Sequence, residues 1–205
     1  MIYDISPPIS ENLKVWPGDT PPTREMQLDM KRGDNLTLST LRSTVHLGAH
    51  ADAPSHYGIN APTIDEQPLE IYIGRCQVMT VTTEPLTRIG PDAIEEAIEA
   101  QRVLFHTGSF PDPNQFNEDF AALSPELISE LASLDVELVG VDAPSVDLFT
   151  SKELPTHKAC LEHGMAILEG LVLTEVPDGI YELVALPLKL VGFDASPVRA
   201  ILRPL

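Results

Sequence analysis

The 205-residue chain has few cysteines and few basic residues. Cys76 and Cys160 lie far apart and form no Cys-x-x-Cys pair, so no disulfide framework is implied and a reducing compartment fits. Only 13 residues are Lys or Arg against 31 Asp or Glu, so the net charge is −18. Nucleic acids and anionic membrane surfaces both require a basic footprint, and the sequence therefore argues against either as a partner.

Long apolar runs are also missing. No stretch approaches the roughly 20 apolar residues of a membrane span, and the N-terminus reaches Pro7 and Pro8 without the apolar segment of a signal peptide. We therefore expect a cytoplasmic protein. The length fits one substantial domain over residues 1–205 with its own core.

The chain does concentrate metal-binding side chains in residues 46–56, which have the sequence HLGAHADAPSH. Three of the six histidines and one carboxylate fall here, separated by small or apolar residues; they are His46, His50, Asp52 and His56. A lone histidine in a loop is usually solvated or hydrogen-bonded, but this grouping is hard to attribute to solubility or packing. The pattern indicates a metal site.

These side chains meet only if the segment bends. A strand rises about 3.3 Å per residue, which would separate the backbones of His46 and His50 by about 13 Å, too far for both imidazoles to bind one metal at about 2.1 Å. Gly48 between them gives the chain freedom to turn, and Pro54 prevents a regular helix from running on to His56. We therefore predict a loop that gathers these ligands around a point.

The rest of the chain alternates strand and helix patterns, which predicts a single mixed α/β domain with some parallel pairing. The expected strands are residues 36–45, 76–83, 102–107, 136–141, 166–174, 181–191 and 198–202. One helix is expected over residues 92–98, and a second begins at Ser124. The buried stripe of the second helix would be Leu127, Ile128, Leu131 and Leu134. Residues 1–25 are rich in proline and glycine and are expected to form a rigid loop.

Two further residues stand out from their surroundings. Trp16, the only tryptophan, lies in the proline-rich segment 15–22, either as a hydrophobic plug at one end of the core or as an aromatic wall against a ligand. Composition alone favours the plug. Glu169 is the single carboxylate of the apolar run 165–173, where a charge is costly to bury unless it is paired or binds a cation.

The motif His-x-Gly-x-His-x-Asp-x-Pro-x-His resembles that of the cyclase-type metal-dependent hydrolase family, which includes the bacterial kynurenine formamidases. Further segments are similar to the formamidase branch along nearly the whole chain; they are Asp4–Ile9, Trp16–Pro21, Gly140–Ser145, Met165–Leu171 and Leu186–Leu190. The resemblance implies the swivelling β/β/α type of fold, with a mixed sheet and flanking helices, and a homodimer. Ala49 stands where the family more often has threonine, so no role is carried over for a hydroxyl there.

By position, the resemblance implies that His157 and Glu169 complete the set of metal ligands and that Trp16 contacts the substrate. Other candidates with nearby or metal-like spacing match no ligand position and are interpreted as structural or surface residues; they are Cys160, His163 and His106.

Five ligands for two ions require sharing, and carboxylates are the groups that bridge. Asp52 and Glu169 are therefore the expected bridges, with His46 and His50 on one ion and His157 on the other. Zinc is the expected metal, although a nitrogen and oxygen ligand set also accepts manganese, cobalt or iron.

His56 is then left free to move protons, a task suited to an imidazole near neutral pH. The resemblance implies a metal-dependent amidase that hydrolyses a small aryl formamide, N-formyl-L-kynurenine, to L-kynurenine and formate in tryptophan breakdown. One alternative is a related hydrolase of a cyclic amide or lactone. Another is a non-catalytic protein with structural zinc, although such sites usually close four ligands rich in cysteine, and this motif has none.

Overall fold

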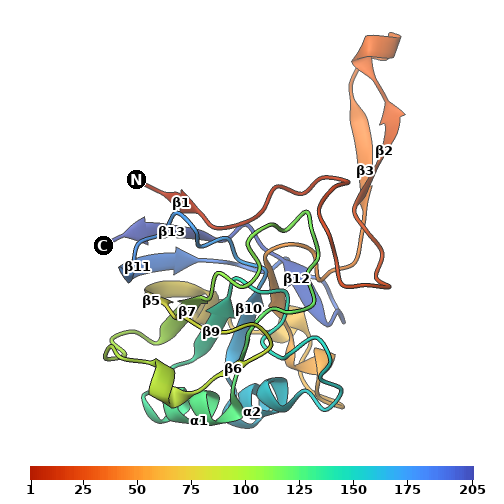
Figure 1. Ribbon diagram of the computed structural model, residues 1–205. Helices are drawn as coiled ribbons and strands as arrows, with labels where there is room; N and C mark the ends of the chain where they lie inside the picture. Colours follow the sequence, from red (N-terminus) through yellow and green to blue (C-terminus); the bar gives the residue numbers. More distant parts are fainter.

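The computed structural model describes all 205 residues and contains one nine-stranded mixed sheet with two α-helices (Figure 1). In space the strands follow the order β1-β13-β11-β5-β7-β9-β10-β4-β12. Their bounds are Tyr3–Asp4 (β1), His50–Asp52 (β4), Ile73–Thr80 (β5), Arg102–His106 (β7), Leu138–Val141 (β9), Ala166–Glu169 (β10), Gly179–Val184 (β11), Ala195–Pro197 (β12) and Ile201–Pro204 (β13). This architecture confirms the predicted α/β fold.

Two smaller sheets and several short turns complete the structure. One of the smaller sheets pairs β2 (Thr23–Leu28) with β3 (Leu38–Arg42). The other pairs β6 (Arg88–Ile89) with β8 (Ala122–Leu123). Short 3-10 helices lie at Met30–Arg32, Pro54–His56, Ile64–Glu66, Leu69–Tyr72 and Pro91–Ala93. The α-helices are α1 (Pro125–Ser133) and α2 (Pro155–His163), and none of the helices has the length and apolar character of a membrane span.

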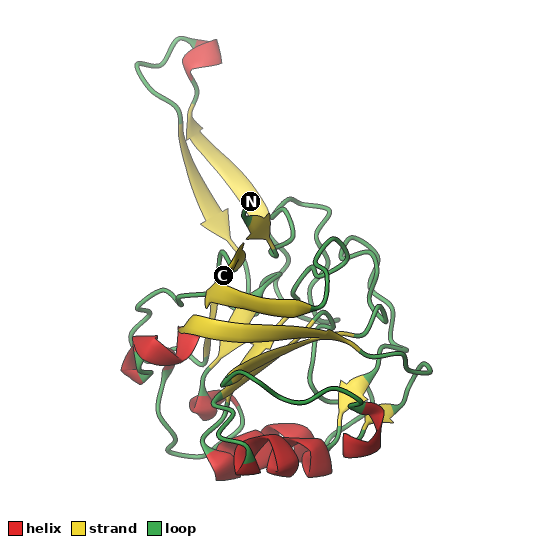
Figure 2. Ribbon diagram, turned by 90° about the vertical axis from the view of Figure 1, so that its left-hand side faces the viewer, coloured by secondary structure: helices red, strands yellow, loops and turns green.

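The centre of the sheet is parallel. β5, β7, β9 and β10 run in the same direction, and the chain passes through α1 between β7 and β9 and through α2 between β9 and β10. Both helices lie against one side of the sheet, at the bottom of Figure 1 and Figure 2. The carboxyl ends of the parallel strands therefore meet at one edge, where ligands commonly bind in α/β proteins.

Side chains of the central strands alternate between two cores, as the two-residue period of a strand requires. On β7, Val103 and Phe105 pack on the helix side with Leu127 and Ile128 of α1, whereas Leu104 packs on the other side. All five are buried. Burying a side chain of this size contributes roughly 1.5–3 kcal/mol, so both faces of the sheet are stabilised.

β2 and β3 form a hairpin that projects away from the body of the molecule in Figure 1 and Figure 2. All residues of β3 are exposed. The strand predicted over residues 36–45 is confirmed only for Leu38–Arg42, and this strand lies outside the main sheet. The loop predicted for residues 1–25 likewise contains β1 and the start of β2.

The helix predicted over residues 92–98 is wrong. Only a 3-10 turn forms, at Pro91–Ala93, and no α-helix follows. The side chain of Gln77 accounts for the difference, because its amide donates to the carbonyl of Ala97 and its oxygen accepts from the backbone N–H of Glu99. Tertiary hydrogen bonds override the local apolar pattern here.

Other predicted boundaries shift for local reasons. Leu134 is half-exposed rather than buried, because α1 ends at Ser133. The strand expected over 166–174 ends at Glu169, where Gly170 turns the backbone with φ +65°. The strands expected over 76–83, 136–141, 181–191 and 198–202 are displaced or shortened to β5, β9, β11 and β13.

Gly170 is required by a close approach of two chain segments. A Cβ atom at this position would lie 2.2 Å from the carbonyl oxygen of Gly48, at φ +65°. Gly170→Ala is expected to lower the free energy of unfolding by more than the roughly 1–2 kcal/mol that a left-handed alanine costs, because the backbone must also move. Gly164→Ala is the matched control, since Gly164 has the same φ and a Cβ added there would meet no atom within 4 Å. Equal losses for the two variants in urea denaturation would contradict the close approach.

Candidate metal centre and active site

Strand pairing brings His50, Asp52 and Glu169 to one place. β4 lies antiparallel to β10, with His50 opposite Glu169 and Asp52 opposite Ile167. Ala51 points into the core on the far side of the sheet, so its two neighbours on β4 point to the side that carries the helices. The three ligand candidates are buried, with 4 %, 1 % and 3 % of their surface exposed.

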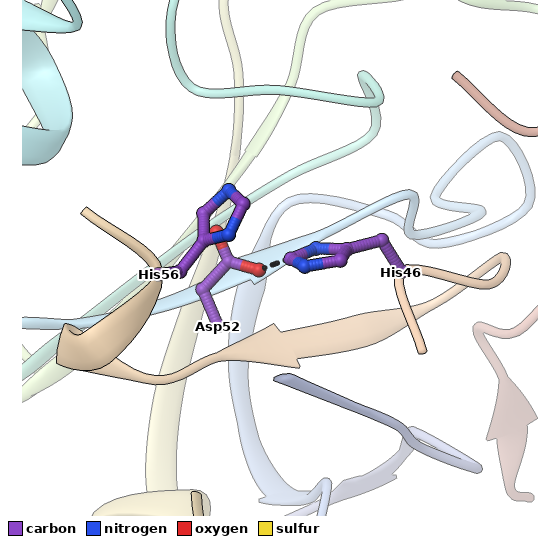
Figure 3. Close-up of side chains that lie close together, drawn as sticks. All are labelled: His46, Asp52 and His56. Atoms are coloured by element: carbon purple, nitrogen blue, oxygen red, sulfur yellow. Dashed lines mark ion pairs between the residues drawn. The ribbon is translucent and has the colours of Figure 1, made fainter. Parts of the chain in front are cut away.

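His46 joins this group because the chain turns at Gly48, which has φ +58°. Nδ1 of His46 lies 3.1 Å from Oδ1 of Asp52 (Figure 3). Nε2 of His50 lies 3.5 Å from the same oxygen. The bend predicted between the two histidines is present, and both imidazoles face one carboxylate oxygen.

His157 comes from α2, a helix that the sequence did not predict. Its Nε2 lies 3.5 Å from Oδ2 of Asp52 and 3.5 Å from Oε1 of Glu169. The first turn of α2 is fixed by Asp147, whose carboxylate accepts from the backbone N–H groups of Thr156 and His157. A carboxylate at a helix N-terminus is also favoured by the helix dipole.

The two carboxylates divide these contacts between their oxygens. Asp52 presents Oδ1 to His46 and His50 and Oδ2 to His157. Glu169 presents Oε2 to His50 and Oε1 to His157. The arrangement is compatible with two ions bridged by carboxylates, with histidines on either side.

Three buried polar atoms of this cluster have no hydrogen-bond partner: Nε2 of His50 and both carboxylate oxygens of Asp52. His50 donates from Nδ1 to the carbonyl oxygen of Gly48 at 2.8 Å, so in the neutral ring a lone pair on Nε2 is aimed at Asp52 and Glu169. Buried acceptors that face one another are costly unless a cation lies between them. The histidines and carboxylates present therefore fit a divalent metal ion such as zinc.

In the metal-free protein, protons supply part of that positive charge. Burial lowers the pKa of His46, but the nearby carboxylates of Asp52 and Asp194 outweigh it, and the pKa rises to about 9. Burial is likewise outweighed at His157, whose pKa is raised by its hydrogen bond to Asp147 and by the nearby carboxylates of Asp52 and Glu169. At pH 7 the imidazole of His46 is then protonated, and a metal ion must displace this proton.

The affinity for zinc is therefore expected to rise with pH from about 7 and to level off near pH 9, as His46 deprotonates in the metal-free chain. Displacement of one proton changes the dissociation constant tenfold per pH unit, so the apparent Kd should fall by about tenfold per unit. Titration of the metal-free protein with zinc against a competing chelator measures this. An affinity that does not change over this window would remove His46 from the ligand set.

His56 lies on the solvent side of the cluster, with 34 % of its side chain exposed. Its ring centroid is 4.3 Å from that of His46 (Figure 3), and its Nδ1 lies 3.3 Å from Oδ2 of Asp194. One atom each of His46, Asp52 and His56 also lie within 4.8 Å of one another. The geometry thus permits His56 to act either in proton transfer or as a ligand.

The cluster borders a cavity of about 400 Å³. Trp16, Phe110 and Phe116 line the same cavity as the site histidines. Trp16 also packs against Phe116 and Phe149, with ring centroids 5.8 and 5.0 Å away. It therefore combines features of both interpretations, since it belongs to an aromatic cluster and also forms part of the cavity wall.

His106, interpreted from the sequence as structural, lines this cavity as well. It ends β7, and its Nε2 lies 3.8 Å from Oδ2 of Asp142, which follows β9. Cys160 and His163, the other two residues set aside, lie outside the ligand groups; Cys160 is a buried free thiol, and His163 is exposed.

The model of the family described as "Putative cyclase" matches residues 3–148, and two solved structures share 32 % sequence identity with the chain. The chain belongs to the Cyclase family. One of these structures is a potential metal-dependent hydrolase with cyclase activity, with a TM-score of 0.84 over 98 % of this chain and 96 % of that one. The other is a predicted metal-dependent hydrolase from Bacillus stearothermophilus, with a TM-score of 0.83 over 98 % and 97 %. Isatin hydrolase A from Labrenzia aggregata, bound to benzyl benzoate, shares the Cyclase-family fold at 21 % identity, with a TM-score of 0.84 over 98 % and 93 %.

Two carboxylates of this Cyclase-family site were not predicted from the sequence. Asp147 is fully buried; its Oδ2 accepts from Nδ1 of His157 at 2.8 Å, and its Oδ1 pairs with Arg88 at 2.7 Å. It lies ten residues before His157, so proximity in sequence was a signal for it. Asp194 contacts His56 although it lies 138 residues further along the chain, and no local sequence pattern indicates that it belongs to the site.

Proposed function

We propose that this protein is a metal-dependent amidase that hydrolyses N-formyl-L-kynurenine to L-kynurenine and formate. The observation that carries the proposal is the cluster of histidines and two buried carboxylates beside an aromatic-lined cavity. A volume of about 400 Å³ suits a substrate with a single aromatic ring. Membership of the Cyclase family and similarity to metal-dependent hydrolases support hydrolysis as the reaction.

The two proposed ions, zinc or alternatively manganese, cobalt or iron, would be held by His46, His50, Asp52, His157 and Glu169. Divalent ions held there supply Lewis acidity toward the formyl oxygen and lower the pKa of a water. Asp147 holds the proton of His157 on Nδ1, so that Nε2 faces Asp52 and Glu169.

His56 is the proposed general base and acid. Its Nδ1 faces Asp194, which leaves Nε2 without a protein partner, and the residue lines the cavity. From this position it would take a proton from the attacking water and return one to the departing arylamine nitrogen. Its partial exposure lets it exchange protons with solvent between turnovers.

Substrate recognition would be shared between aromatic and charged residues of the cavity wall. Trp16, Phe110 and Phe116 offer ring faces and edges to an aryl group. Lys14 and Asp19 line the same cavity and carry opposite charges, which suits the zwitterionic amino-acid group of N-formyl-L-kynurenine.

A cyclic amide or lactone is the second candidate substrate, because structures with this fold include isatin hydrolases at 19 to 21 % identity. Isatin has no amino-acid group, so the pair of Lys14 and Asp19 favours the open-chain formamide. A purely structural zinc site is disfavoured because the cluster contains no cysteine and borders a cavity.

Parallel assays of N-formyl-L-kynurenine, isatin and a lactone panel test the proposal, with metal content measured on the same preparation. We expect the highest kcat/KM for N-formyl-L-kynurenine and loss of turnover on chelation. Preferred turnover of isatin or a lactone would assign the enzyme to ring opening. Complete unfolding on chelation, followed by circular dichroism, with no hydrolysis of any compound would support a structural site.

Trp16→Ala is expected to raise the KM for N-formyl-L-kynurenine by about 5- to 150-fold, since loss of a stacked indole costs roughly 1–3 kcal/mol. Metal content should not change, and Trp16→Phe should be milder. Phe120→Leu controls for lost packing, because Phe120 is buried, lies 6.2 Å from Trp16 between centroids and does not line the cavity. Unchanged kinetics in Trp16→Ala, or an equal rise in KM in Phe120→Leu, would show that Trp16 only packs the core and does not bind the substrate.

A further inference from the structure

One oxygen atom of Asp194 contacts two histidines of the site. Oδ2 lies 3.0 Å from Nε2 of His46 and 3.3 Å from Nδ1 of His56. No Lys or Arg forms an ion pair with this carboxylate, so the two imidazoles are its only ionic partners.

The sheet fixes the position of Asp194. The residue immediately precedes β12, where Ala195 pairs with Asp52 of β4. Its own carbonyl accepts from the backbone N–H of Ala53 at 2.8 Å. The backbone around the carboxylate is therefore tied to the strand that carries the ligand candidates, although 47 % of the side chain is exposed.

These contacts determine where each imidazole carries its proton. A carboxylate oxygen has two lone pairs, so Oδ2 of Asp194 can accept from both rings. His46 then bears its proton on Nε2 and offers Nδ1 to the side of Asp52. His56 bears its proton on Nδ1 and keeps a free lone pair on Nε2, which has no protein partner.

We propose that Asp194 is a positioning residue that fixes the tautomers of His46 and His56 together. It would set Nδ1 of His46 as the metal-facing nitrogen and Nε2 of His56 as the proton acceptor in the cavity. The role at His56 rests on the proposed amidase function, whereas the role at His46 requires only that the cluster binds metal. One carboxylate thus links the ligand set to the base.

Asp65 provides a matched control because it supports the same loop without touching either histidine. Its Oδ1 accepts from the backbone N–H of Gly192 at 3.0 Å and from the hydroxyl of Thr63 at 2.7 Å. Asp194→Asn and Asp65→Asn remove the same charge with the same change of shape. A comparison of the two separates positioning of the histidines from support of the loop.

The first test measures ¹⁵N chemical shifts of the imidazoles in the zinc-loaded protein at alkaline pH, together with the Kd for zinc. Wild type should show the proton of His56 on Nδ1, and Asp194→Asn should show a mixture of tautomers and a Kd raised by about 10- to 100-fold. Asp65→Asn should match wild type. Unchanged tautomers and Kd in Asp194→Asn, or equal changes in Asp65→Asn, would overturn the proposal.

The second test is a double-mutant cycle on kcat at saturating zinc. Asp194→Asn alone should lower kcat by about 10- to 100-fold with little change in KM. In a His56→Ala background the same change should lower kcat by no more than about twofold, because the partner is gone. A full further loss there would show that Asp194 does not act through His56. If N-formyl-L-kynurenine is not a substrate, the shifts and the zinc Kd still decide the role of Asp194.

Discussion

Replacing His50 with alanine is expected to remove bound metal and to lower kcat/KM by at least about 10³, because Lewis-acid stabilisation of the transition state amounts to several kcal/mol. His50 is buried, and its Nε2 lies 3.5 Å from Asp52 and 3.3 Å from Glu169. Without the imidazole, the two carboxylates lose one of the two histidines that contact both of them. Elemental analysis and steady-state kinetics on the same sample measure both losses.

His163→Ala is the control for this experiment. His163 is exposed at the end of α2 and contacts Ser129, so its removal should leave metal content and turnover unchanged. A His50→Ala variant that keeps its metal and most of its turnover would exclude His50 from the ligand set.

His56→Ala is expected to lower kcat by about 10² to 10⁴ while the metal ions stay bound, because a positioned acid or base typically contributes that much to the rate. The five proposed ligands are untouched by this substitution. The contrast with His50→Ala therefore separates proton transfer from coordination.

Ser55→Ala is a suitable neighbour for comparison, since Ser55 lies in the same 3-10 turn and its buried hydroxyl has no hydrogen-bond partner. Its kcat should match wild type. Loss of metal from His56→Ala would instead place His56 in a ligand group with His46 and Asp52, which lie close enough for this. Full metal content with near-wild-type turnover would remove His56 from the mechanism.

Much of the candidate site could be predicted because its residue types are unusual in their local surroundings. The histidines and the aspartate of residues 46–56 fall within eleven positions, and their spacing requires a bend that the structure places at Gly48. Glu169 is conspicuous as a charge in an apolar run, and the structure buries it beside His50 and His157. The sequence drew attention to these positions, whereas the placement of Glu169 beside His50 depends on the pairing of β4 with β10.

The remaining parts depend on contacts that no local pattern encodes. α2 begins at Pro155 after Leu154, whose side chain does not cap it, and the cap comes instead from Asp147 in an earlier loop. The helix predicted over residues 92–98 does not form, because the side chain of Gln77 from β5 makes hydrogen bonds with the backbone of this segment. Long-range hydrogen bonds thus determine the structure of these two segments, which the hydrophobic periodicity of the sequence could not predict.

The central claim is tested most directly by measuring N-formyl-L-kynurenine turnover while zinc is added back to the metal-free protein. We expect no turnover without metal and a rise that reaches its plateau at two zinc ions per chain. A plateau at one ion would contradict the shared, two-ion arrangement of Asp52 and Glu169. The absence of turnover at every ratio of zinc to protein would contradict the proposed amidase function itself.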